Sequence, residues 1–195
     1  RPTHNLLFLW VFSHACLHPG KWLLAVATVV FVWMVKVFVV NLRDGEKETP
    51  VSLHKIVLEL GERGRTAPLI LRFRDLLDRR IEHLNSAFQG AIRNAGYQGS
   101  YRGVYPIKVN QQQQVLEEIA EFGARYHHGF EAGSKAELIA AISFLHDKEA
   151  YLVCNGYKDA EFIDLGLLAR KMGLQCVFVV ESPSELEQII ERSRE

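Results

Sequence analysis

A lysine stands near the end of a short apolar run, at Lys108 within residues 104–109. The run predicts a buried strand, and a buried ammonium group is costly unless it is paired or its pKa falls. One explanation is covalent chemistry, because a lysine amine forms a Schiff base with an aldehyde and pyridoxal phosphate is the common aldehyde cofactor. The other is structural: the stem lies along apolar surface and carries its charge to water.

The elements around this lysine alternate from residue 68 onward. Strands are predicted at 68–73, 104–110, 128–133, 151–155 and 176–181, and helices at 75–96, 112–123, 135–145, 159–173 and 183–195. The first of these helices carries an apolar stripe of Leu76, Ile81, Leu84, Phe88 and Ile92. Continuous Val, Ile and Leu strands indicate burial on both faces and hence a parallel α/β sheet. Local pattern does not separate an open sheet from a closed barrel, but the absence of a GxGxxG turn disfavours a dinucleotide-binding fold.

Polar residues recur at the carboxyl ends of these strands, where the catalytic groups of a barrel lie. They are Lys108, Asn110, Glu131, Ser134, Asn155, Glu181 and Ser182. Ser134 and Ser182 precede helices and are expected to cap them, and Asn155 is expected to cap the next helix rather than line a pocket. Glu137 is expected to be a first-turn acid that favours the helix dipole. Capping does not account for Lys108 or Glu131.

Four segments in register carry a family resemblance. They are GVYPIKVNQ (103–111), HGFEAGSKAEL (128–138), YLVCNGYKDAEFI (151–163) and VFVVESPSELEQI (177–189). The chain resembles the biosynthetic arginine decarboxylases, which are pyridoxal-phosphate enzymes with an alanine-racemase-type barrel. The likeness extends upstream through residues 67–88 and more weakly to about Phe38.

The resemblance implies the cofactor, its site and the reaction. Lys108 would hold pyridoxal 5'-phosphate as a Schiff base, and the cofactor-binding residues would be Lys108 and Glu131. Related ornithine and diaminopimelate decarboxylases carry an acid at a similar place. By this resemblance, Glu131 would hold the lysine in position and tune its protonation. The alternative is that Glu131 forms an ion pair with a nearby Lys or Arg. The implied reaction converts L-arginine to agmatine and carbon dioxide, the first step of putrescine and spermidine biosynthesis. Mg²⁺ is a possible further cofactor by resemblance only, without assigned metal ligands, and a homo-oligomer is expected at full length.

The resemblance also implies a parallel (β/α) barrel, of which this chain holds roughly the first half. A closed eight-stranded barrel needs about 250 residues, more than the alternating region provides. We expect an N-terminal part of the enzyme, with an apolar segment at 1–41, a linker and a helix capped by Ser52 at 42–66, and the partial barrel at 67–195. The phosphate-binding and substrate-specificity groups would then lie outside this chain, which alone is expected to be inactive.

The N-terminal segment and the composition bear on location and partners. Residues 22–40 are nearly uniformly apolar, broken by Lys36, and approach the length of a membrane span. They predict either a membrane anchor or a stretch that is not native to the fold. Apart from this segment, we expect a cytoplasmic protein.

The balanced net charge gives no indication of nucleic-acid binding. Cys16, Cys154 and Cys176 form no CxxC pair and indicate reduced thiols, and His14-x-Cys16-x-His18 matches no common zinc spacing.

Two other functions fit the same residues. One is a non-catalytic pyridoxal-phosphate-binding barrel protein, against which the count of five strands argues. The other is a truncated or membrane-anchored pseudo-enzyme that acts through interactions, for which the apolar N-terminus is the main support.

Overall fold

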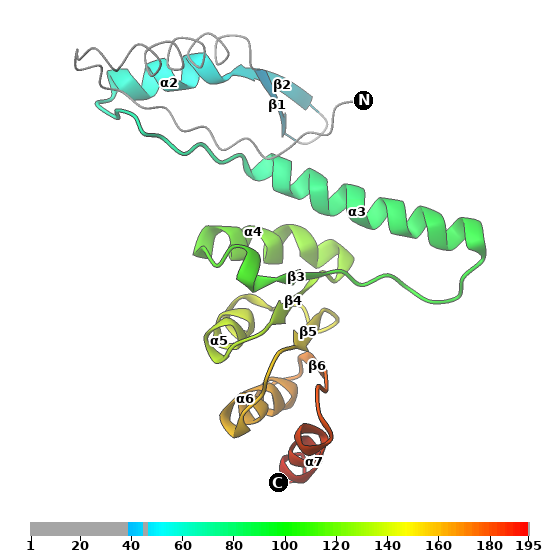
Figure 1. Ribbon diagram of the computed structural model, residues 1–195. Helices are drawn as coiled ribbons and strands as arrows, with labels where there is room; N and C mark the ends of the chain where they lie inside the picture. Colours follow the sequence, from blue (N-terminus) through cyan, green and yellow to red (C-terminus); the bar gives the residue numbers. More distant parts are fainter. Residues whose placement is uncertain (1–38, 45–46, 195) are drawn as a thin grey trace, which may run out of the picture. The chain divides into compact units, whose positions relative to one another are not determined.

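A computed structural model describes residues 39–44 and 47–194 of the chain, which divides into two compact units, one up to Asp75 and one from Leu76 onward (Figure 1). The predicted anchor up to residue 38 and the His14, Cys16 and His18 set lie outside the described residues. Within the described part, no helix combines the length and apolar character that crossing a membrane requires.

The first unit is a hairpin followed by a helix. Strand β1 (Val39–Asp44) pairs antiparallel with β2 (Lys47–Ser52). Much of the segment before the helix, expected as a linker, is therefore strand. Helix α2 (Leu53–Glu62) begins where predicted, and the Ser52 side chain accepts a 3.4 Å hydrogen bond from the Lys55 N–H. Leu53 is the buried residue of a small core that includes Val40, Ile56, Leu71 and Phe73.

The second unit alternates strands with helices. Its elements are α3 (Arg74–Ala95), β3 (Val104–Pro106), the 3₁₀ turns η1 (Ile107–Val109) and η2 (Ala124–Tyr126), α4 (Gln113–Gly123), β4 (Gly129–Ala132), α5 (Lys135–Phe144), β5 (Tyr151–Cys154), α6 (Ala160–Lys171), β6 (Gln175–Phe178) and α7 (Pro183–Arg192). The strands form one parallel sheet in the order β3-β4-β5-β6. Helices α4 to α7 pack in sequence beside one another (Figure 1). The parallel α/β prediction is confirmed.

Two strand predictions differ from the structure. Residues 68–73 form no regular secondary structure and pair with no strand in the described chain, and Leu71 and Phe73 pack in the core around Leu53. The second unit therefore has four strands among its described residues rather than the expected five. The strand expected to hold Lys108 ends at Pro106, which has no N–H to continue a ladder.

The core lies between the sheet and its helices. Phe130 and Ala132 on β4, and Leu152 and Cys154 on β5, are fully buried and belong to the cluster formed with the helices. Because strand residues alternate between faces, Glu131 points to the opposite side of the sheet. The thiols of Cys154 and Cys176 are buried and free, with sulfurs 3.5 Å apart, as predicted for reduced cysteines.

Helix α3 buries a different face from the one its apolar stripe predicts. Ile81 is buried, but Leu76, Leu84 and Phe88 are 42 to 45% exposed. Asn85 is buried in their place, and its side chain donates a 2.8 Å hydrogen bond to the Ile81 carbonyl, which satisfies the amide locally. Phe88 stacks on Tyr101 with ring centroids 4.0 Å apart, so an apparent core position covers a loop.

His128, at the start of the predicted strand 128–133, lies directly before β4 and is buried between Gly103 and Gly123. Burial lowers the pKa of His128 from its ordinary value of 6.5, so the unfolded chain binds more protons than the folded chain once the pH falls below that value. We expect the free energy of unfolding to fall as the pH drops through this range and to level off below the folded pKa. Urea unfolding at several pH values measures this.

The matched variants for this prediction are His128→Gln and His146→Gln, the second at an exposed histidine. The first should flatten the pH dependence, and the second should leave it in place. An unchanged pH dependence in His128→Gln would contradict the prediction.

Candidate active site at the carboxyl ends of the strands

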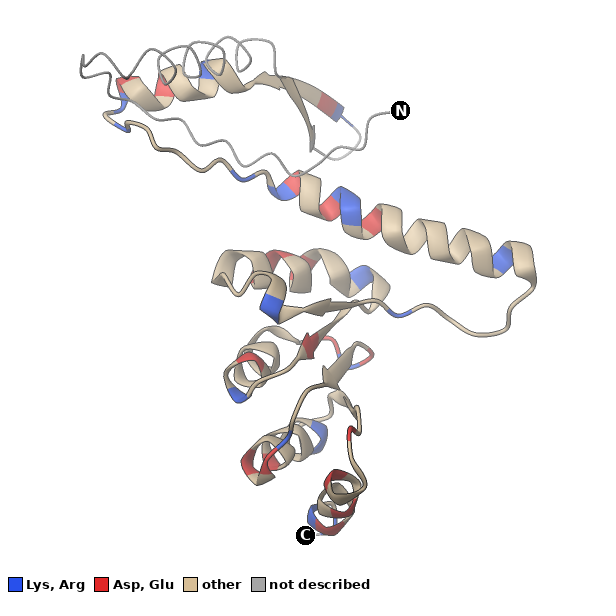
Figure 2. Ribbon diagram, viewed as in Figure 1, with Lys and Arg blue, Asp and Glu red and all other residues tan. Residues whose placement is uncertain are grey.

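The register of the parallel sheet brings the predicted polar residues to one edge. Pro106 lies opposite Glu131, and Glu131 lies opposite Val153. Lys108 follows the end of β3, and Asn155 follows the end of β5, so both flank the end of β4 where Glu131 stands. In the four strands of the second unit, all of them described, Glu131 is the single charged residue; the other charges lie on helices and turns (Figure 2).

Lys108 lies in the 3₁₀ turn η1 and is exposed. Its ammonium group is therefore not buried, although the apolar residues around it in the sequence predicted a buried position. Among the described residues its amine has no hydrogen-bond or ion-pair partner. Two other lysines follow strands at this edge. Lys135 pairs with Asp159 at 2.8 Å and Glu161 at 2.6 Å, and Lys158 pairs with Glu185 at 3.2 Å. Lys108 is therefore the lysine of the three whose amine is available for reaction.

Glu131 is a buried carboxylate with one satisfied oxygen. Its side chain is held by Asn155, whose Nδ2 donates a 3.0 Å hydrogen bond to Oε1. Oε2 has no partner within the described chain, although the residue is only 7% exposed. The alternative of an ion pair with Lys or Arg is wrong for the described residues. A buried acceptor left open in this way is a place where a ligand group can bind.

Asn155 does not cap the following helix, contrary to expectation. Asp159 caps α6, accepting a 3.0 Å hydrogen bond from the Phe162 N–H. Asn155 is instead fixed at both ends, because its backbone N–H donates to the Ala132 carbonyl at 2.9 Å while its side chain holds Glu131. The predicted helix 159–173 included Asp159 as its first residue, so the sequence pattern did not identify Asp159 as the cap.

The serine caps and the first-turn acid are confirmed. Ser134 Oγ accepts from the Glu137 N–H at 3.3 Å, and Ser182 Oγ accepts from the Glu185 N–H at 3.2 Å. Each glutamate reaches back in turn, Glu137 to the Gly133 N–H and Glu185 to the Glu181 N–H, both at 2.8 Å. The two helices thus begin with the same Ser-x-x-Glu arrangement.

Sequence reasoning missed a buried ion pair at this edge. Lys158 and Glu185 are 2% and 5% exposed, and their contact joins the turn after β5 to the start of α7. Burial acts to raise the pKa of Glu185, but hydrogen bonds from the Glu181 N–H and from Lys158 outweigh it, and the pKa lies below its ordinary value. The Ser182–Glu185 capping box was a readable signal for Glu185; nothing in the sequence marked its lysine partner.

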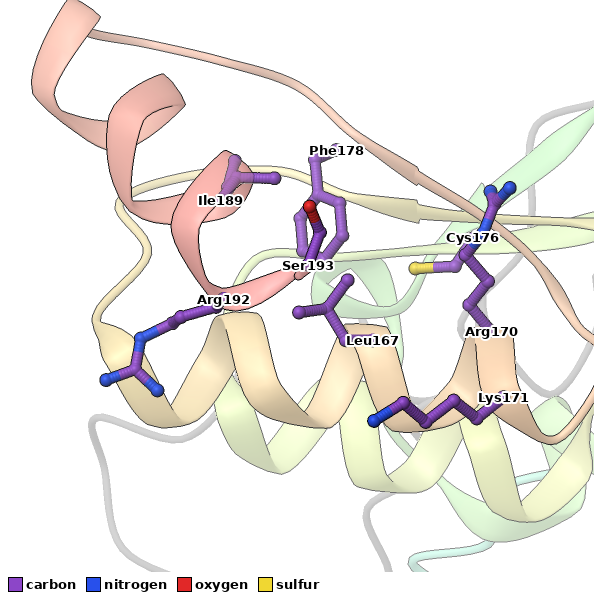
Figure 3. Close-up of a pocket in the computed structure, with 8 residues that line it drawn as sticks. All are labelled: Leu167, Arg170, Lys171, Cys176, Phe178, Ile189, Arg192 and Ser193. Carbon is purple, nitrogen blue, oxygen red and sulfur yellow. The ribbon is translucent and has the colours of Figure 1, made fainter. Parts of the chain in front are cut away.

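A cavity of about 590 Å³ lies elsewhere, between α6, α7 and β6 (Figure 3). Its lining residues are Leu167, Arg170, Lys171, Cys176, Phe178, Ile189, Arg192 and Ser193. The lining does not include Lys108, Glu131 or Asn155, so this cavity is separate from the strand-end site.

No cluster of three or more His, Cys, Asp or Glu residues suited to a metal ion occurs in the described chain.

The strand-end residues fit a carbonyl cofactor, since within residues 39–44 and 47–194 neither the Lys108 amine nor one oxygen of the buried Glu131 carboxylate has a partner. Residues 78–195 match the family described as pyridoxal-dependent decarboxylase, pyridoxal binding domain. The chain therefore belongs to the pyridoxal-dependent decarboxylases, and pyridoxal phosphate is the cofactor of this domain.

The relatives narrow the likeness within that family. The chain is 48% identical over 151 residues to the biosynthetic arginine decarboxylase of Prochlorococcus marinus strain MIT 9313 and 44% identical over 146 residues to that of Thermosynechococcus vestitus. These matches cover 77% and 75% of the chain, but the chain spans only 23% of either relative.

A solved structure gives the same result. The crystal structure of the biosynthetic arginine decarboxylase from Campylobacter jejuni superposes with a TM-score of 0.74 at 34% identity, over 85% of this chain and 28% of that one. The parallel βα units described above therefore correspond to part of an arginine decarboxylase fold.

Replacing Asn155 with alanine tests how Glu131 is held. The buried Glu131 carboxylate would lose its only hydrogen-bond partner in the described chain, and an unsatisfied buried group costs about 1–3 kcal/mol. We expect the free energy of unfolding in urea to fall by about that amount. Asn94→Ala, on the exposed part of α3, is the control and should change it by less than about 0.5 kcal/mol. Equal effects would show that the Asn155–Glu131 contact contributes nothing.

Proposed function

We propose that this chain is part of an enzyme that decarboxylates L-arginine to agmatine and carbon dioxide, the first step of polyamine biosynthesis. The observation that carries the proposal is the Lys108 amine, unpartnered among the described residues, at the edge where Glu131 lies buried. The relatives of this domain are named biosynthetic arginine decarboxylases. The activity would belong to the whole protein, because the chain spans 23% of the length of those relatives.

The residues of this chain would have distinct roles. Lys108 Nζ would hold the cofactor covalently through its aldehyde carbon. When bound, pyridoxal phosphate supplies an electron sink for the electron pair left on the α-carbon as the carboxylate departs. Glu131 would favour a positive charge on the nitrogen at the lysine position, since a nearby carboxylate stabilises the protonated form. Asn155 would keep that carboxylate in one rotamer through its 3.0 Å hydrogen bond.

The proposal extends to setting and assembly. A cytoplasmic location is supported by the free thiols of Cys154 and Cys176, which a reducing compartment maintains. A homo-oligomer of the whole protein and a role for Mg²⁺ rest on the family resemblance alone.

Borohydride reduction of the whole protein with pyridoxal phosphate, followed by peptide mapping, tests the site. We expect the reduced cofactor on the peptide that contains Lys108. Labelling of Lys135 or Lys158 instead would overturn the assignment.

The reaction is tested separately by measuring agmatine and carbon dioxide from arginine, with ornithine and diaminopimelate as competing substrates. Cofactor fixed at Lys108 without product from arginine would favour the non-catalytic binding protein. Faster turnover of ornithine or diaminopimelate would move the proposal to another substrate.

A further inference from the structure

The buried ion pair of Lys158 and Glu185 is placed where it can act on the strand-end site. The Lys158 side chain is 0% exposed and the Glu185 side chain 6%, and Nζ lies 3.2 Å from Oε1. Removing two charges from water costs free energy that their attraction often fails to recover. A buried pair at the edge of a binding site is therefore a candidate for a role in shaping that site.

Glu185 ties together two turns that follow neighbouring strands. Its Oε1 accepts hydrogen bonds from the backbone N–H of Lys158 at 3.1 Å and from Nζ at 3.2 Å. Its Oε2 accepts from the Glu181 N–H at 2.8 Å. Because Lys158 follows β5 and Glu181 follows β6, one carboxylate fixes both turns.

Lys158 fixes the turn after β5 from its other side. Nζ donates a 2.5 Å hydrogen bond to the Gly156 carbonyl. Gly156 has a φ of +71°, and a Cβ there would stand 3.1 Å from the Gly133 carbonyl oxygen. The turn therefore combines a left-handed conformation with a close approach to the turn after β4, and Lys158 holds it there.

Asn155 connects this turn to the site. It is the residue before Gly156, and its side chain holds Glu131 at 3.0 Å. A continuous set of contacts thus runs from Glu185 through Lys158 and Gly156 to Asn155 and Glu131.

Capping alone does not explain the pair. Glu137 occupies the same position in its own Ser-x-x-Glu arrangement as Glu185. In the described part of the chain, its second oxygen accepts a hydrogen bond only from the Gln111 side chain, at 3.4 Å. Lys135 also pairs with acids near the start of a helix, but its side chain is 42% exposed. Helix α5 therefore begins with the same Ser-x-x-Glu arrangement and an exposed lysine, so capping does not require the burial of Lys158.

We propose that Lys158 and Glu185 are positioning residues that hold the turn after β5 in the conformation in which Asn155 reaches Glu131. Part of the inference rests on the proposed function, in that Glu131 is taken to serve the pyridoxal phosphate site. The hydrogen-bonded arrangement itself is independent of that function.

Hydrogen exchange of the whole protein without cofactor tests the positioning directly. Glu185→Gln and Lys158→Met should speed amide exchange at least tenfold in peptides covering 151–159, while α5 stays protected. The matched controls Glu137→Gln and Lys135→Met should change exchange at 151–159 less than twofold. Unchanged exchange at 151–159, or equal changes in the control variants, would overturn the proposal. Lys158→Met keeps every backbone hydrogen bond to Glu185 and decides the question if Glu185→Gln does not fold.

Pyridoxal phosphate affinity, measured by equilibrium titration, tests the consequence for the site. Lys158→Met and Asn155→Ala should each weaken binding at least tenfold, and the double variant should be no weaker than Asn155→Ala alone because both act through the same contact. Losses that multiply would overturn the route through Asn155. If the protein takes up no pyridoxal phosphate, the proposed function fails while the exchange result still decides the positioning.

Discussion

Replacing Lys108 with alanine should abolish arginine decarboxylation by the whole protein, lowering kcat by at least about a thousandfold because the covalent attachment of the cofactor is lost. The other two lysines at this edge, Lys135 and Lys158, are held in ion pairs and are not expected to replace it. Release of labelled carbon dioxide from carboxyl-labelled arginine measures the effect. Lys171→Ala, at the separate cavity, is the control and should retain activity.

The same variant separates chemistry from structure. Because Lys108 is exposed and unpartnered within the described residues, its removal should change the free energy of unfolding by less than about 0.5 kcal/mol. A folded, stable and inactive Lys108→Ala protein would fit the proposed role. Full activity in that protein would rule it out and favour a lysine that merely reaches water from a strand end.

Replacing Gly129 with alanine should destabilise the second unit by about 3 kcal/mol or more, since overlap inside a packed sheet cannot relax cheaply. An added Cβ would overlap the backbone carbonyl of Tyr151 on β5, and backbone in a paired strand does not turn aside as a side chain can. Glu131 stands two residues further along β4, so the distortion should also reach the candidate site. Urea unfolding measures the loss.

Gly90→Ala provides the matched control in the same unit. Gly90 lies within α3, and a Cβ there would meet nothing within 4 Å. Alanine in a helix interior is favoured over glycine by about 0.5–1 kcal/mol, so this variant should be more stable than the parent. A Gly129→Ala protein as stable as Gly90→Ala would contradict the packing argument.

The sequence predicted the features that depend on near neighbours. The caps at Ser52, Ser134 and Ser182 were identified because a hydroxyl and an amide two or three residues later are enough to form them. The parallel alternation followed from apolar runs, and the gathering of Lys108 and Glu131 at one edge followed from it, because parallel strands end on the same side.

What the sequence did not predict depends on residues that meet only in the fold. The Asn155 side chain binds the Glu131 carboxylate, 24 positions earlier, and does not cap the helix that follows it. The partner of Lys158 is Glu185, 27 positions later. The segment 68–73 has strand-like composition, but a strand needs a neighbour and this segment packs its side chains on Leu53 instead. In α3, a polar Asn85 takes a buried place because its amide can be satisfied by the helix backbone.

The strand order β3-β4-β5-β6 has a consequence for how this unit forms. Every strand pairs only with the strand immediately before or after it in sequence, so each new βα segment docks on one that is already present. Such sequential pairing permits folding to proceed in step with synthesis on the ribosome, from β3 toward β6. The segment that carries Lys108 would then fold first. The contact between Lys158 and Glu185 would form last, because Glu185 lies on α7.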